Sequence, residues 1–141
     1  IEMAQEAAEQ APGSLLSAMV DGDLSKISAK TPFNAARQGD AVAAAVVDKY
    51  LDYLAVGMVN IINILQPEVI VIGGGVSKEG ENLLVPLKGK VARSCYGQEG
   101  IPTAELRLAL MGNDAGIVGA ALLGFPPEKR ARVSLFGRGR Q

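Results

Sequence analysis

The segment that most constrains the fold is a continuous apolar run between a proline and three glycines. Residues 68–72 read Glu-Val-Ile-Val-Ile after Pro67, and a glycine triplet occupies residues 73–75. A short β-branched run that follows a long helical segment is typical of a strand buried on both faces, as in the parallel sheets of α/β proteins. The sequence therefore predicts a buried parallel strand that ends in a glycine turn.

Helices are predicted on the amino-terminal side of this strand, and the longest one ends next to it. They cover residues 2–11, residues 14–20 with Ser14 as N-cap, residues 32–37 after Thr31 as N-cap, and residues 40–65 with Asp40 as N-cap. In the longest helix apolar residues recur at steps of three and four. No charged residue lies between Asp52 and Glu68, so its second half is predicted to be buried nearly all round.

A second strand and two more helices are predicted after the glycine turn. The helix of residues 77–93 carries an apolar stripe, residues 104–110 alternate as a strand does, and residues 115–123 form a last helix. This order predicts a right-handed parallel crossover. Two parallel strands leave apolar surface uncovered unless other strands complete the sheet, and residues 1–11 already read as running helix from Ile1. We therefore expect the chain to be a portion of a longer protein.

The composition excludes several kinds of catalytic site. The 141 residues include no His and one Cys, Cys95, so the chain holds no Ser-His-Asp triad, no Cys-His pair, no internal disulfide and no thiolate zinc cluster. Residues 126–141 carry five basic groups and one acid, which leaves a charge of −5 on residues 1–125. An acidic body argues against a nucleic-acid interface, and the basic tail of residues 126–141 is expected to be mobile.

The glycine turn is the strongest chemical signal in the chain. Glycines let the backbone take positive φ and approach a ligand, and a helix that follows offers free N–H groups. Residues 73–78 fit neither the P-loop nor the dinucleotide-binding pattern. The residues alone leave two interpretations open, a tight turn without a ligand and a nucleotide site. A second turn at residues 112–116 follows the next strand, and Asp114 there is either a helix cap or part of the same site.

Three segments of the chain carry a wider pattern. Asn60–Ser77 contains the strand and glycine turn, residues 110–121 contain the second turn, and residues 35–40 read Ala-Ala-Arg-Gln-Gly-Asp. In this order and spacing they resemble the carboxyl-terminal part of the ROK family (repressors, open reading frames and kinases), most closely its glucokinase-type sugar kinases. The resemblance implies an α/β fold, part of an actin-like, ribonuclease H-like ATPase lobe, over residues 1–125.

The same resemblance implies which residues bind a ligand. Gly73, Gly74, Gly75 and Val76 correspond to the adenosine-binding turn of the family, and Asn113 is a further candidate contact with the nucleotide. The helix from Ala115 corresponds to a helix at the hinge between the two lobes. No catalytic residue is assigned in this chain, and Asp114 is not taken as the catalytic base.

Several family motifs do not occur in this sequence. They are the Asp-x-Gly-Gly-Thr phosphate loop, the catalytic Asp in its Asn-Asp-Ala-Asn setting, the sugar-binding Glu-x-Gly-His motif and the cysteine-rich zinc motif. Because these motifs are missing, we expect this chain alone to be inactive. For the complete protein, the resemblance implies a cytoplasmic, homo-oligomeric kinase that uses ATP and Mg²⁺ to phosphorylate a small sugar. It also implies that this kinase binds neither nucleic acid nor membrane. Two alternatives remain: the sugar-sensing domain of a ROK repressor, and a structural or oligomerisation domain whose glycines only turn the chain.

Overall fold

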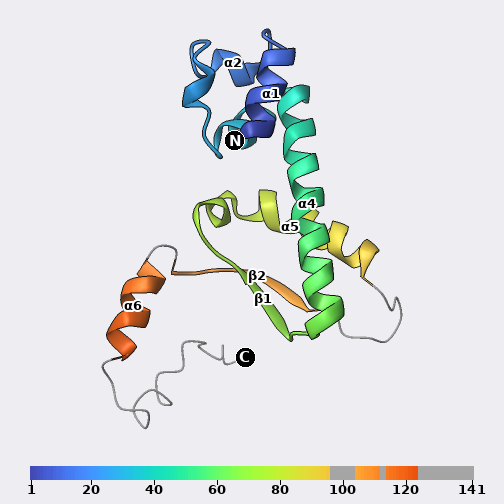
Figure 1. The fold of residues 1–141 in the computed structure, drawn as a ribbon, viewed down its shortest axis with the longest axis vertical. Coiled ribbons are helices and arrows are strands. Elements are labelled where there is room, and N and C mark those ends of the chain that lie inside the picture. Colours follow the sequence, from blue (N-terminus) through green and yellow to red (C-terminus); the bar gives the residue numbers. More distant parts are fainter. Residues whose placement is uncertain (96–103, 112–113, 124–141) are drawn as a thin grey trace. The chain divides into compact units, whose positions relative to one another are not determined.

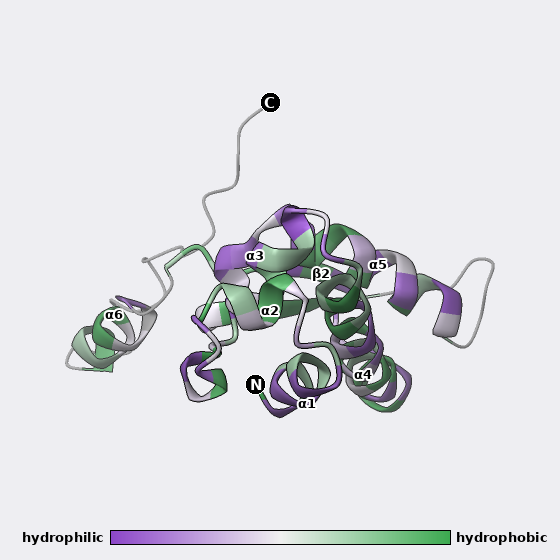
Figure 2. Ribbon diagram, turned by 90° about the horizontal axis from the view of Figure 1, so that it is seen from above, coloured by the Kyte–Doolittle hydropathy of each residue, from purple (hydrophilic) through white to green (hydrophobic). Residues whose placement is uncertain are grey.

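The computed structural model describes residues 1–95, 104–111 and 114–123. The chain divides into two compact units, residues 1–109 and residues 110–141. The first unit contains five α-helices among its described residues, together with a sheet of two strands (Figure 1). The second contains α6 (Asp114–Leu123), which begins one residue before the predicted helix and is mainly hydrophobic in Figure 2. None of the described helices is long and apolar enough to cross a membrane.

Short helices surround the first half of the long helix α4 (Ala41–Leu65). They are α1 (Glu2–Gln10), α2 (Leu15–Ala18), the 3-10 helix η1 (Leu24–Lys26) and α3 (Thr31–Arg37). Their small and aliphatic residues form one core with the start of α4, made of Ala4, Ala8, Leu16, Val20, Ile27, Ala35 and Ala43. The predicted helices are confirmed in place and order, although α2 is shorter than expected.

The N-caps of these helices agree only in part with prediction. Asp40 caps α4 as predicted, because its Oδ1 accepts a hydrogen bond from the Ala43 N–H at 2.7 Å. Ser14 occupies the N-cap position of α2 but makes no capping bond with its side chain, and the Leu15 N–H instead donates to Oδ2 of Asp40 at 2.6 Å. Thr31 was expected to be an N-cap, whereas α3 already includes it as its first residue. The Asp40 carboxylate thus replaces the hydroxyl that local sequence indicated for α2.

The second half of α4 is buried on one side only, so the prediction of burial nearly all round is wrong. Ala55, Met58 and Ile62 are buried, whereas Ile64 and Leu65 are 78% and 70% exposed. One side stays exposed because α5 (Glu81–Ser94) and the sheet pack against the other side of this helix. The helix ends as predicted, since Gln66 takes the left-handed conformation before Pro67.

The sheet consists of two parallel strands, as predicted. Strand β1 (Val69–Ile72) pairs with β2 (Glu105–Leu108), with Val69 opposite Glu105 and Ile72 opposite Leu108. Leu106 is buried between the exposed Glu105 and Arg107, which confirms the predicted alternation within β2. The strand is shorter than the predicted residues 104–110, and Leu110 is 99% exposed. Burial of β1 on both faces is not found among the described residues, because Val71 is half exposed there.

The main core lies between α4, α5 and the sheet. The predicted stripe of Leu83, Leu84, Leu87 and Val91 on α5 is buried there. The helix expected over residues 77–93, however, begins only at Glu81. A 3-10 helix, η2 (Gly75–Glu79), precedes it, and Gly80 separates the two with φ +62° and ψ −133°, a conformation that ends a helical ladder and favours glycine.

Candidate functional site

The glycine turn lies at the carboxyl end of β1, beside the end of β2. The Ala109 N–H donates to the Ile72 carbonyl at 2.8 Å, which holds the two strand ends together. Gly74 has φ +80° and ψ −169°, a conformation that strains any residue with a Cβ. A Cβ at Gly73 would make an ordinary contact with Cβ of Ala109 at 3.6 Å. The fold itself therefore requires glycine at residue 74 and tolerates a side chain at residue 73.

The backbone after the turn is closed by Ser77. Its hydroxyl donates to the Gly74 carbonyl at 2.7 Å, and its N–H donates to the same oxygen at 3.3 Å. These bonds start η2, a segment of five residues, whereas α5 begins only at Glu81. The α-helix amino terminus that was expected directly after the glycines is therefore not there. A ligand at this turn would contact the glycine backbone and the lining of the cavity described next.

That cavity has a volume of about 520 Å³ and lies between the turn and the loop before α3. It is lined by Ser28, Ala29, Lys30, Gly75, Val76 and Glu79. A Cβ at Gly75 would meet no atom within 4 Å, so the backbone there is open. The volume falls within the usual range for small-molecule sites. The loop of residues 28–30 was not predicted to contribute, because nothing in the sequence links it to the glycine turn.

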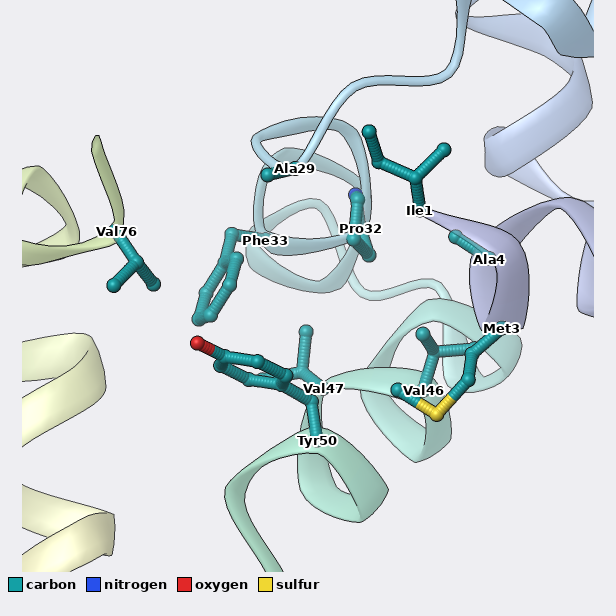
Figure 3. A pocket seen from close by; sticks show the side chains of 10 residues that line it. All are labelled: Ile1, Met3, Ala4, Ala29, Pro32, Phe33, Val46, Val47, Tyr50 and Val76. Atoms are coloured by element: carbon teal, nitrogen blue, oxygen red, sulfur yellow. The ribbon is translucent and has the colours of Figure 1, made fainter. Parts of the chain in front are cut away.

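A second, smaller cavity of about 100 Å³ adjoins the first and is almost entirely apolar (Figure 3). Val76 and Ala29 line both cavities. In Figure 3 the Val76 side chain faces Phe33 and the hydroxyl end of Tyr50. The two rings pack edge to face, with centroids 6.2 Å apart, and burial raises the pKa of the Tyr50 phenol. Val76 is thereby packed on its inner side while the glycines beside it stay open.

One ion pair joins the segment after the turn to α3. The Arg37 guanidinium donates through Nη1 to Oε2 of Glu79 at 2.7 Å, and through Nη2 to Oδ1 of Asn34. The Glu79 side chain is only 7% exposed, whereas that of Arg37 is 45% exposed. The pair was not predicted from the sequence, because the two residues are 42 positions apart and no local pattern links them.

The structure brings together four of the five candidate residues. Gly73, Gly74, Gly75 and Val76 are consecutive in the turn, whereas Asn113 lies outside the described residues. Asp114 begins α6 in the second unit and is exposed. Across residues 1–95, 104–111 and 114–123 there is no group of three or more His, Cys, Asp or Glu residues that could hold a metal ion.

A solved structure and two curated relatives match this chain. The structure is a ROK family glucokinase from Streptomyces griseus in complex with glucose and AMPPNP. It matches with a TM-score of 0.77 and 34% sequence identity, and the match covers 86% of this chain and 40% of that chain. The glucokinase of Halalkalibacterium halodurans is 45% identical over 69% of this chain and 29% of its own length. The glucokinase of Thermotoga maritima is 41% identical over 71% of this chain and 31% of its own length.

These matches define the class of protein and then its family. The fold is that of one part of an actin-like ATPase, in which parallel strands are joined by a crossover helix. The family model described as "ROK family" matches residues 6–125. The chain therefore belongs to the ROK family, as the sequence resemblance implied. It spans about a third of the length of the two glucokinases above.

Proposed function

We propose that this chain supplies the nucleotide-binding turn of an ATP-dependent hexose kinase of the glucose type. The observation that carries the proposal is the open backbone at Gly75, which borders a cavity of about 520 Å³ at the end of a parallel strand. The similarity to a glucokinase that holds AMPPNP supports ATP as the nucleotide. Gly73, Gly74, Gly75 and Val76 contact the adenosine in this proposal, with Asn113 as a further contact.

The residues present suit this ligand. Without side chains at residues 74 and 75, the backbone admits a planar ring at van der Waals distance. Val76 and Ala29 offer apolar surface, and the hydroxyl of Ser28 and the ammonium of Lys30 offer polar partners on the opposite wall. When bound, ATP supplies the phosphoryl group that is transferred. The chain's own part is to bind and orient the adenosine.

Catalysis requires groups that we do not assign to this chain. Phosphoryl transfer needs Mg²⁺ to neutralise charge and a carboxylate to orient and deprotonate the attacking hydroxyl. The described residues contain no metal cluster, and the sequence lacks the family's catalytic and sugar-binding motifs. The small sugar, Mg²⁺, the homo-oligomer and the cytoplasmic setting belong to the complete kinase in this proposal. The similarity to three glucokinases favours a kinase over the sugar-sensing domain of a repressor.

A substitution at Gly75 tests the proposal directly. Gly75→Val places methyl groups in open space at an ordinary φ, so the fold should tolerate it while the ligand should not. We expect the parent chain to bind ATP and Gly75→Val to bind it at least about tenfold more weakly, the effect of a clash of ~1.4 kcal/mol. Amide NMR shifts during an ATP titration measure both affinities, including weak ones.

Gly13→Val is the matched control for this experiment. Gly13 also lies in a turn, has an ordinary φ and faces open space, but it does not line the cavity. It should bind ATP as the parent does, and circular dichroism should show both variants folded. If the parent does not bind ATP, or if Gly75→Val binds it equally well, the glycines only turn the chain and the structural interpretation holds.

A further inference from the structure

We infer that the ion pair between Arg37 and Glu79 holds the glycine turn in the shape that accepts a nucleotide, so that both are positioning residues. This inference rests on the function proposed above and adds residues to which neither the family pattern nor the predicted site assigns a role. It is based on three observations: Glu79 is buried, a glycine flanks η2 on each side, and Glu79 lines the same cavity as Gly75.

The buried charge of Glu79 needs a compensating partner. A carboxylate as buried as that of Glu79 is costly unless a cation and hydrogen bonds compensate for the loss of water. Arg37 supplies both through the 2.7 Å bond from Nη1 to Oε2. Its Nη2 is held by Asn34, which lies one turn away on α3, so the guanidinium is fixed to that helix from its other side. Glu79 is therefore tied to a firmly placed group.

The segment that carries Glu79 has a permissive backbone at both of its ends. Gly74 and Gly80 bracket η2 and both have positive φ, so the backbone turns at each end of this segment through residues with few steric restraints. The hydrogen bonds from Ser77 to Gly74 and from Gly80 to Ser77 are local to the segment. They shape η2 but do not attach it to another element. Val76 packs against Phe33 and Tyr50 near the start of η2, and the bond from Arg37 to Glu79 attaches its end to α3.

The ion pair also borders the cavity beside the glycine turn. Glu79 and Gly75 line the same cavity, at the two ends of η2. When Glu79 is tied to α3, Gly75 and Val76 are held opposite the loop of residues 28–30, which leads into that helix. The pair also neutralises a carboxylate that would otherwise face an anionic nucleotide. Loss of the pair should thus widen the motions of the turn and weaken nucleotide binding.

The test uses the 141-residue chain with a variant that removes both charges. Arg37→Met with Glu79→Met leaves no unpaired buried charge and keeps the side chains long, so it should fold. We expect ATP affinity to fall about tenfold, the usual worth of a charged hydrogen bond. In the absence of ATP, amide hydrogen exchange of residues 74–80 should become faster while the exchange of α5 stays unchanged. Glu79→Gln alone, which keeps a weaker hydrogen bond, should give a smaller loss.

Lys26→Ala is the matched control, because it breaks the exposed ion pair of Lys26 with Asp23 away from the cavity. It should change neither ATP affinity nor exchange in residues 74–80. If the parent binds ATP and the double variant binds it within about twofold of the parent, the inference is wrong and the proposed function stands. If the parent binds no ATP, the proposed function fails and the inference fails with it.

Discussion

At the scale of single residues, Asp40 holds the starts of two helices, α4 and α2. Its two carboxylate oxygens accept hydrogen bonds from the Ala43 N–H at the start of α4 and from the Leu15 N–H at the start of α2. The bond from Ala43, followed by that from Leu15, lowers the pKa of Asp40 below its usual value of 3.8. One ionised group thus caps two helices that are far apart in the sequence.

Asp40→Ala should therefore destabilise the chain at neutral pH. Two lost caps at ~1 kcal/mol each predict a fall of about 2 kcal/mol in the free energy of unfolding. Because the pKa of Asp40 is lower in the folded than in the unfolded state, its contribution is present above the unfolded value and is lost as pH falls through the folded one. Urea unfolding at neutral and at acidic pH measures this contribution.

The comparison with the parent chain provides the control for this prediction. The gap in stability between the parent and Asp40→Ala should shrink as the pH falls. Asp40→Asn, which retains a side-chain oxygen and can still cap one helix, should lie between the two. A gap of the same size at neutral and acidic pH would show that ionised Asp40 is not the source of the stabilisation.

At the scale of elements, α4 and α5 are joined by their apolar faces and by one cluster of three charges. Lys90 on α5 contacts Asp48 at 2.7 Å and Asp52 at 2.5 Å, and these two acids lie one turn apart on α4. The hydrogen bond to Asp48, followed by that to Asp52, raises the pKa of Lys90 above its usual value of 10.5. Two acids in the first half of α4 thus face a cation of the neighbouring helix.

Lys90→Met should lower the urea midpoint at neutral pH, because it leaves Asp48 and Asp52 to repel each other. The folded state raises the pKa of Lys90, so its contribution is complete below the unfolded pKa and disappears as pH rises through the folded one. Lys88→Met is the matched control on the same helix, since Lys88 is exposed. Equal effects of the two substitutions, or an effect unchanged in strong alkali, would contradict this role for Lys90.

At the scale of the whole molecule, apolar surface stays open on both the sheet and the long helix. Val71 on β1 and Ile64 and Leu65 on α4 are all well exposed. Their residue types led us to predict burial, and the prediction failed because, among the described residues, these elements are packed on one side only. The chain spans 29% and 31% of two glucokinases and 40% of a third, so relatives have much more structure with which to cover such faces.

The 141-residue chain should not phosphorylate glucose. It carries no assigned catalytic base or sugar-binding motif, and the nucleotide-binding turn that we propose would provide binding without transfer. A coupled assay for glucose 6-phosphate, with ATP, Mg²⁺ and glucose present, measures this. The glucokinase of Thermotoga maritima serves as the positive control. Glucose phosphorylation by the purified chain would show that our assignment of the missing groups is wrong.

Much of the fold could be predicted because the signals are local. Asp40 as a cap, the stripe from Leu83 to Val91 and the end of α4 at Gln66 follow from residues a few positions apart. The site was predicted in part: the glycine turn was found, but Ser28, Lys30 and Glu79 on the cavity wall were not. The break at Gly80 was also missed, since a glycine within a helical pattern does not by itself reveal its φ.

By itself, the sequence determined the α-helices and strands, their order and the ROK family to which the chain belongs, because caps, apolar periodicity and motifs act over short stretches. It did not indicate the 3-10 helices. The tertiary structure alone decided which distant residues meet. Arg37 reaches Glu79 across 42 positions, and the loop before α3 faces Val76. Those contacts depend on how α3 packs beside the long helix and how η2 leaves the sheet, which no local pattern encodes.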